Sequence, residues 1–142
     1  MRIRAMRDMD KESWLQMRAE LWPESDKPGA EAWLNRDDAI TLLALNNEDL
    51  AIGFAEAGER AYADGCDTSP VAFLEGWYVR PAHRNQSIGR ELVNAVEEWA
   101  RARGLTELAS DALLEDEAAI RSHICIGFAE VERSVKFRKP LS

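Results

Sequence analysis

A carboxylate interrupts the most apolar stretch of this 142-residue sequence. Residues 71–79 (VAFLEGWYV) are almost continuously apolar, as in a central strand, yet they contain Glu75 followed by Gly76. An unpaired buried carboxylate is costly, so we expect Glu75 to face a polar cleft or a partner. Glycine within a strand indicates a bulge or the close approach of another backbone or a ligand, and a bulge would free N–H groups near residues 77–79. The alternative is an ordinary edge bulge with a solvated glutamate.

The residues directly after this strand are suited to binding an anion. Residues 80–90 (RPAHRNQSIGR) include the cations Arg84 and Arg90 and lead into an amphipathic helix. A helix N-terminus presents unpaired N–H groups and the positive end of the helix dipole. Local positive charge in a chain of net charge −8 is what a pyrophosphate needs. We interpret His83 as a loop residue near that phosphate.

The periodicity along the chain predicts a mixed α/β fold, in one domain spanning residues 1–142. The expected strands cover 1–6, 40–46, 50–60, 71–79, 105–110 and 129–139, with the second and third forming an antiparallel hairpin. The expected helices run from an N-cap at Asp8 or Asp10 to Pro23, over 30–36, from Ile88 to just before Gly104, and over 115–126 with Gly127 closing the last.

Composition narrows the function classes. A hydrophobic content of 46% fits one domain with its own core. No apolar run approaches the roughly 18 residues of a membrane span, and the first residues lack the apolar centre of a signal peptide. Cys66 and Cys125 lack metal-ligand spacing, so we expect a cytoplasmic protein without a metal. The acidic balance disfavours nucleic acid and would attract a cationic small molecule, although solubility alone would also explain it.

Residues 79–92 resemble motif A of the GCN5-related N-acetyltransferase (GNAT) superfamily, whose core Arg/Gln-x-x-Gly-x-Gly/Ala reads RNQSIG over 84–89 here. The element order is also similar, so the resemblance covers essentially the whole chain. It implies a central mixed, mostly antiparallel sheet flanked by helices, and acetyl-CoA as co-substrate. The implied coenzyme contacts are Trp77, Tyr78, Val79, Arg84, Asn85, Gln86, Ser87, Ile88, Gly89 and Asp116.

Ser87 departs from the family pattern, which has glycine at this position. If the backbone there is left-handed, serine costs about 1–2 kcal/mol. Its hydroxyl group would instead offer a phosphate one more hydrogen bond, so the sequence leaves the sign of the effect on coenzyme affinity open.

Four further segments resemble aminoglycoside 6′-N-acetyltransferases of the small dimeric branch: 21–23 (LWP), 65–76 (GCDTSPVAFLEG), 109–111 (ASD) and 130–133 (EVER). This implies a homodimer, joined through the strand expected near residues 131–139, and an aminoglycoside as partner. The implied antibiotic contacts are Trp22, Tyr62, Glu75, Asp111 and Glu132. A polycationic antibiotic needs carboxylates and flat rings. Ordinary structural roles are the alternatives: Trp22 as a core residue, Tyr62 as a loop residue, Asp111 as a turn or helix-capping residue and Glu132 as a solvated strand residue.

The bond to be made suggests roles for two residues. We expect Glu75 to accept the amine proton, and amides near Gly76 to stabilise charge on the thioester oxygen. His123, four residues before Gly127-Phe128, holds a place where many superfamily members carry a tyrosine acid. It is a candidate to protonate the thiolate, or else a packing or coenzyme-contacting residue.

Direct transfer needs no covalent enzyme intermediate, so neither cysteine has an assigned role. Two rival functions remain. One is the same chemistry on a polyamine, an amino sugar or a protein amine, because fold does not settle the acceptor. The other is a non-catalytic acyl-CoA sensor.

Overall fold

The computed structural model describes residues 1–142 and divides into two compact units, Met1–Asp111 and Ala112–Ser142. The first unit holds a five-stranded sheet in the order β1-β2-β3-β4-β5. The pairs β1–β2, β2–β3 and β3–β4 are antiparallel, whereas β4 and β5 are parallel. The mixed, mostly antiparallel sheet predicted from the sequence is therefore confirmed. The strands are β1 (Arg2–Ala5), β2 (Ala39–Leu45), β3 (Ala51–Arg60), β4 (Val71–Val79) and β5 (Leu108–Ser110).

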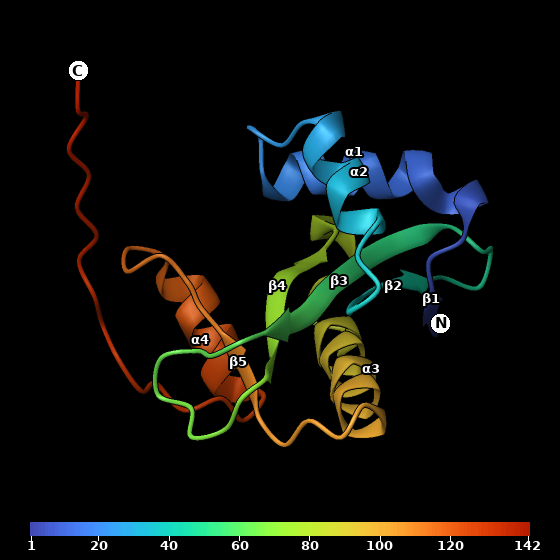
Figure 1. Ribbon diagram of the computed structural model, residues 1–142. Helices are drawn as coiled ribbons and strands as arrows, with labels where there is room; N and C mark the ends of the chain where they lie inside the picture. Colours follow the sequence, from blue (N-terminus) through green and yellow to red (C-terminus); the bar gives the residue numbers. More distant parts are fainter. The chain divides into compact units, whose positions relative to one another are not determined.

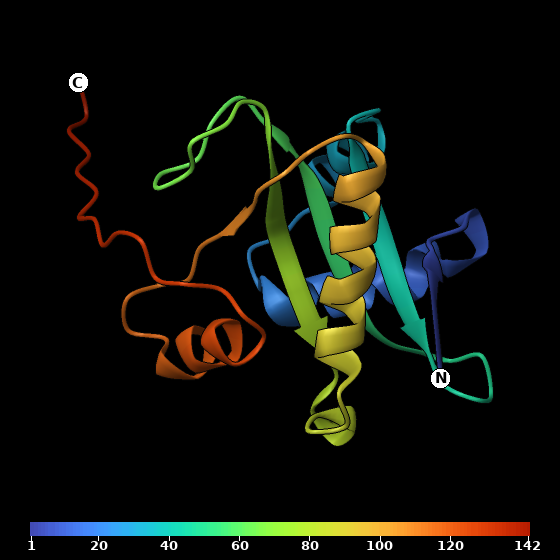
Figure 2. The same ribbon diagram turned by 90° about the horizontal axis from the view of Figure 1, so that it is seen from below.

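Helices cover both faces of this sheet. α1 (Lys11–Leu21) and α2 (Lys27–Leu34) lie on one face (Figure 1), and α3 (Ile88–Ala102) crosses the other (Figure 2). The predicted apolar stripe of α3 is confirmed at Ile88, Leu92, Val93, Val96 and Ala100, which are all buried, whereas Trp99 of the same stripe is only partly buried. The core beneath α1 and α2 consists of Trp14, Met17, Ala30, Leu43, Leu45, Phe54 and Tyr78.

The ends of the three helices in the first unit can be compared with the capping residues predicted from the sequence. A short 3-10 turn, Asp8–Asp10, precedes α1. Asp10 occupies the N-cap position of α1, as one of the two predicted alternatives, but its carboxylate makes no capping hydrogen bond and instead accepts from Arg4 and from the Arg7 N–H. α2 begins three residues earlier than predicted, because Asp26 caps it by accepting a 2.7 Å hydrogen bond from the Gly29 N–H. Gly104, at φ +78°, follows α3 as predicted.

The second unit contains one helix, α4 (Glu117–Cys125), close to the predicted range of 115–126. Gly127, at φ +104°, closes it as predicted. The predicted strand over 129–139 is wrong for the single chain, where residues 128–142 form neither helix nor strand. The apolar–polar alternation is present, but a strand needs a neighbour to pair with. In neither unit is a helix both long and apolar enough to cross a lipid bilayer.

Candidate active site

Glu75 is the extra residue of a β-bulge in β4. Glu56 of β3 lies opposite Gly76, and the next residue, Ala57, lies opposite Leu74, so Glu75 has no partner in the register. The predicted bulge is confirmed. The bulge places Gly76, and not Glu75, opposite Glu56 in the register.

Gly76 gives room to an aromatic ring. A Cβ atom on Gly76 would lie 2.6 Å from Cη2 of Trp22, closer than real carbon atoms approach. Trp22 directly follows α1 and meets Phe54 edge to face, with ring centroids 6.4 Å apart. This close contact at Gly76 comes from a side-chain ring, and not from the backbone or ligand that the sequence predicts. It places the half-buried Trp22 indole beside the bulge that carries Glu75.

Arg60, the last residue of β3, is the partner of Glu75. Its Nε donates to Oε2 at 2.8 Å and its Nη2 to Oε1 at 2.7 Å. The guanidinium carbon also lies 3.5 Å from the centroid of the Phe73 ring. Bonding to Glu75 raises the pKa of Arg60, and the charge of Asp111 raises it further. Sequence reasoning missed Arg60, because only the register of β3 against β4 brings residues 60 and 75 together.

A second carboxylate, Glu56, lies on β3 opposite the bulge and is only 1% exposed. It accepts hydrogen bonds from Nε1 of Trp14 at 3.1 Å and from Arg18 at 2.8 and 3.1 Å. Burial raises the pKa of Glu56, whereas its bonds to Arg18 oppose that rise. The Arg18 guanidinium carbon lies 4.9 Å from the Trp22 ring centroid, so one face of that indole already has a cation. Sequence reasoning missed Glu56, although it interrupts an apolar strand as Glu75 does.

The pairing of β5 with β4 ends at Leu74, the residue before the bulge. β5 pairs with β4 only at Ala72, Phe73 and Leu74, so residues 75–79 have a strand neighbour only on the β3 side. The Trp77 indole Nε1 donates a hydrogen bond to the Gly89 carbonyl at 3.0 Å. A Cβ atom on Gly89 would lie 3.1 Å from the Trp77 ring. The end of β4 and the start of α3 are thus held together where the resemblance implies a coenzyme site.

The loop before α3 contains two left-handed residues, Asn85 at φ +64° and Ser87 at φ +66°. The backbone at Ser87 is therefore left-handed, which is the conformation that costs serine free energy. The Ser87 side chain makes no capping hydrogen bond. Nε of Arg84 donates to the Val79 carbonyl at 2.8 Å, which ties the loop to the end of β4. Gln86 is exposed, whereas the Ile88 side chain is buried in the core.

Tyr62 lies in the loop between β3 and β4 and is 70% exposed. The Glu107 carboxylate, just before β5, holds this loop by accepting hydrogen bonds from the N–H groups of Asp67 at 2.9 Å and Thr68 at 2.7 Å. Asp111, exposed just after β5, acts electrostatically on Arg60. The structure therefore places Trp22 against Gly76 in the bulge that carries Glu75, and leaves Tyr62 open to solvent.

Three predicted site residues lie in the second unit. Asp116 caps α4 by accepting a 3.0 Å hydrogen bond from the Ala119 N–H. Nδ1 of His123 lies 2.7 Å from the Ala119 carbonyl oxygen, and its ring meets Phe128 edge to face at 5.2 Å. Glu132 is exposed. The proposed functional roles of these residues stay predictions.

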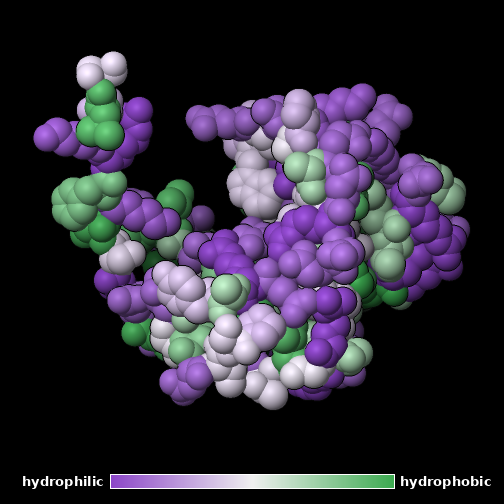
Figure 3. All heavy atoms as spheres, viewed as in Figure 1, coloured by the Kyte–Doolittle hydropathy of each residue, from purple (hydrophilic) through white to green (hydrophobic).

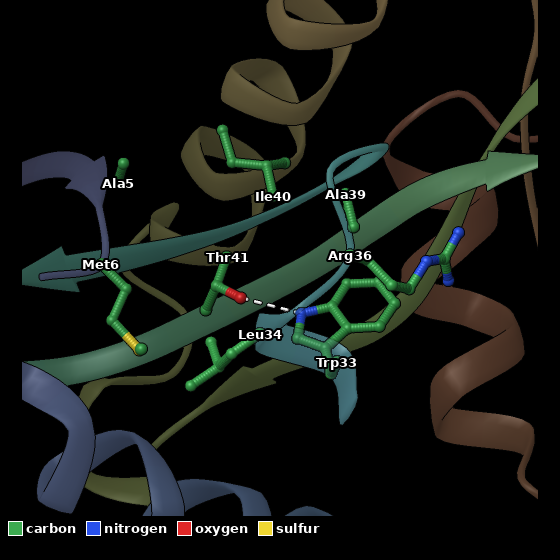
Figure 4. Close-up of a pocket in the computed structure, with 8 residues that line it drawn as sticks. All are labelled: Ala5, Met6, Trp33, Leu34, Arg36, Ala39, Ile40 and Thr41. Carbon is green, nitrogen blue, oxygen red and sulfur yellow. Dashed lines mark hydrogen bonds between the residues drawn. The ribbon is translucent and has the colours of Figure 1, made fainter. Parts of the chain in front are cut away.

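A hollow of about 200 Å³ lies between the end of α2 and the start of β2, beside the end of β1 (Figure 4). In it the Trp33 indole donates to the Thr41 hydroxyl at 2.8 Å. Its lining residues are Ala5, Met6, Trp33, Leu34, Arg36, Ala39, Ile40 and Thr41, none of which is a predicted site residue. No group of three or more His, Cys, Asp or Glu side chains is placed to hold a metal ion.

Known proteins resemble this chain over nearly its full length. Residues 3–128 match the model of the acetyltransferase (GNAT) family. The chain is 44% identical to aminoglycoside N(6′)-acetyltransferase type 1 of Klebsiella aerogenes, over 98% of this chain and 96% of that protein. The apo structure of an aminoglycoside antibiotic 6′-N-acetyltransferase from Acinetobacter haemolyticus matches with a TM-score of 0.91 and 36% identity, over 100% of both chains. AAC(6′)-Iy, in complex with the bisubstrate analogue CoA-S-monomethyl-acetylneamine, matches with a TM-score of 0.90 and 36% identity, over 98% of this chain and 97% of that one.

Proposed function

This chain belongs to the acetyltransferase (GNAT) family, and we propose that it transfers the acetyl group of acetyl-CoA to the 6′-amino group of aminoglycoside antibiotics, conferring resistance to them. The observation that carries the proposal is the bulge in β4, which carries Glu75 and has the Trp22 indole packed against its Gly76. The names of the relatives supply the acceptor class.

The acceptor side of the site combines acidic groups with aromatic rings. Glu75 and Asp111 supply negative charge near the bulge, and Trp22 and Tyr62 supply flat surfaces. An aminoglycoside carries several ammonium groups on sugar rings, so it gains from both kinds of contact. Glu132 adds a further carboxylate to this set in our proposal.

The coenzyme side is built from backbone. The edge of β4 at Trp77, Tyr78 and Val79 has no strand neighbour on the β5 side and suits an extended, amide-containing arm. The residues at 84–89 lead into α3, whose N-terminus favours phosphate. Ile88 and Gly89 contribute through their backbone, because the first is buried and the second packs under Trp77. Asp116 completes the proposed coenzyme contacts.

The reaction proceeds by direct attack of the amine on the thioester that acetyl-CoA supplies. Glu75 accepts the proton of the acceptor's ammonium group, directly or through water, and orients the amine. N–H groups beside the bulge stabilise the negative charge that develops on the thioester oxygen. His123 donates a proton to the departing thiolate.

The two compact units form one domain in this proposal, because the family match runs across residues 111 and 112 without a break. Two chains form a homodimer through the C-terminal residues. The protein acts in the cytoplasm, where the free thiols of Cys66 and Cys125 stay reduced. Its net charge of −8 disfavours nucleic acid as a partner.

The proposal is tested by acetyl transfer from acetyl-CoA to kanamycin or tobramycin, followed by release of CoA, with the acetylated position read by NMR. Glu75→Gln removes the base, so we expect kcat/KM to fall about a hundredfold or more. His123→Ala should lower kcat with a smaller effect on KM. A wild-type kcat/KM in Glu75→Gln would show that Glu75 is not the base, and an unchanged kcat in His123→Ala would remove the acid role.

The same assay separates the rival functions. A panel of polyamines, simple amino sugars and a lysine-containing peptide is run beside the antibiotics. A higher kcat/KM for any of these than for the aminoglycosides would contradict the proposed acceptor. Tight acetyl-CoA binding without turnover of any amine would indicate a sensor.

A further inference from the structure

A cation of the chain itself already sits on the proposed base. Arg60 engages both oxygens of the Glu75 carboxylate, at 2.8 and 2.7 Å, in the paired geometry that a guanidinium favours. An ammonium group of an acceptor that approaches Glu75 therefore meets a carboxylate whose two oxygens are both engaged.

The route of the Arg60 side chain defines what surrounds that cation. Arg60 lies opposite Val71 in the register, and its guanidinium group reaches along the sheet face to Glu75. On the way it lies over Phe73, with 3.5 Å between the guanidinium carbon and the ring centroid. Phe73 is itself 95% buried in a small core cluster, so its ring has a fixed place. The cation is thus held by a carboxylate on one side and by an aromatic face on another.

The ion pair is accessible enough to exchange. The Arg60 side chain is 44% exposed and that of Glu75 is 22% exposed. A half-exposed ion pair on a long side chain contributes little net stability, so its displacement is inexpensive. The charge of Asp111 also acts on Arg60, so a second carboxylate lies within electrostatic range of the same cation.

We propose that the Phe73 ring and the Glu75 carboxylate form a cation subsite, that the Arg60 guanidinium occupies it in the free protein, and that an ammonium group of the acceptor displaces Arg60 when it binds. The identity of the acceptor rests on the function proposed above. Phe73 becomes a substrate-contacting residue through the face that Arg60 covers, because an aromatic face attracts an ammonium ion as it attracts a guanidinium. Arg60 competes with the substrate, and its removal strengthens binding.

A bracing role for Arg60 leads to the opposite expectation. If the bidentate contact is needed to hold the Glu75 carboxylate in its working orientation, removing Arg60 loosens Glu75 and weakens both binding and turnover. The sign of the change in affinity therefore decides between displacement and bracing.

The test is calorimetric binding of kanamycin to the full chain, with turnover measured on the same samples. In Arg60→Gln we expect the Kd for kanamycin to fall roughly two- to fivefold, the range that an exposed ion pair is worth. Arg60→Lys keeps the positive charge but lacks the planar pair of N–H donors that binds both carboxylate oxygens. The Kd of this variant for kanamycin should therefore lie between those of wild type and Arg60→Gln. Arg101→Gln is the matched control, because it removes one positive charge from the exposed surface of α3, where Arg101 pairs with Glu97 and Glu98. Its Kd should equal that of wild type.

Phe73→Leu, made in the Arg60→Gln background, tests the ring. It should raise the Kd of Arg60→Gln by roughly two- to fivefold, the loss of an exposed cation–π contact. An unchanged or higher Kd in Arg60→Gln would overturn the proposal and indicate bracing. Wild-type protein that binds kanamycin without acetylating it would refute the proposed function alone, because the Arg60 comparison concerns binding. Wild-type protein that does neither would refute both.

Discussion

At the scale of single residues, two carboxylates lie close together on the β3–β4 pair, and their surroundings differ. Glu56 is buried and satisfied by Arg18 and Trp14, whereas Glu75 is partly exposed and paired with Arg60. A buried, fully bonded carboxylate cannot exchange partners without a large desolvation cost. A partly exposed carboxylate can exchange its partners at lower cost. The first is therefore suited to supporting Trp22 through Arg18, and the second to chemistry on a substrate.

Ser87 offers a test of backbone strain beside the proposed coenzyme site. Its φ of +66° is unfavourable for serine, and no capping hydrogen bond compensates. Ser87→Gly relieves about 1–2 kcal/mol of strain and gives back part of it as glycine's extra entropy in the unfolded chain. We expect a net gain of about 1 kcal/mol, seen calorimetrically as a rise in Tm of roughly 3 °C without ligand.

Asn85 is the matched control for this substitution. It has nearly the same φ, +64°, in the same loop, but asparagine tolerates the left-handed region better than serine does. Asn85→Gly should therefore raise Tm by less than Ser87→Gly. A fall in Tm for Ser87→Gly would mean that the serine hydroxyl contributes more to the folded state than the strain costs.

Sequence patterns locate residues that violate a local rule, and they do not locate the partners of those residues. Glu75 and Gly76 are visible because they break an apolar strand. Arg60 is not, because its contact with Glu75 depends on the pairing of residue 60 with residue 71 and on the added residue of the bulge. The same limit hides the contact between Trp22 and Gly76, which only the packing of α1 against β4 creates.

At the scale of elements, the junction between β1 and α1 depends on one ion pair. Arg4 of β1 bonds to the Asp10 carboxylate at 2.6 and 3.0 Å, and the Arg7 N–H donates to the same carboxylate. Both side chains are mostly buried, at 16% and 11% exposure. The bond to Arg4 holds the pKa of Asp10 below its ordinary value. Asp10→Asn should therefore destabilise the protein by about 2 kcal/mol at neutral pH, the worth of a hydrogen bond to a charged group.

The dependence on pH has a definite sign. Because the folded state lowers the pKa of Asp10, its stabilisation is fully present above the ordinary value of 3.8 and is lost as the pH falls through the lowered pKa. Urea unfolding of wild type and Asp10→Asn should give a gap that narrows on acidification below that value. Asp8→Asn, in the same 3-10 turn but exposed, should show almost no gap at any pH. A gap that widens in acid would contradict this account.

Element prediction succeeds where the signal is contained in the element itself. α3 has both its apolar stripe and its terminal glycine, and β4 has its apolar run, so both are predicted well. The segment over 129–139 has the alternation of a strand but no strand neighbour in its own chain. In the single chain it therefore forms no strand.

At the scale of the whole molecule, the C-terminal residues carry the case for a dimer. Val131, Val135 and Phe137 are 64%, 74% and 93% exposed, and they share one face of an alternating segment. The apolar side chains of this segment stand out in Figure 3. Exposed apolar residues with unpaired strand potential are suited to pairing with a second copy, which would bury them and satisfy the backbone.

Phe137→Asp tests this pairing, because a carboxylate on the apolar face opposes burial between two chains. Sedimentation velocity at micromolar concentration should show a dimer for wild type and a monomer for Phe137→Asp. Lys136→Gln is the matched control: it changes the net charge by the same amount at the neighbouring position, on the opposite face of the strand pattern, and should remain dimeric. A monomeric wild type would refute the homodimer. If Phe137→Asp and Lys136→Gln both stay dimeric, the chains associate through another surface.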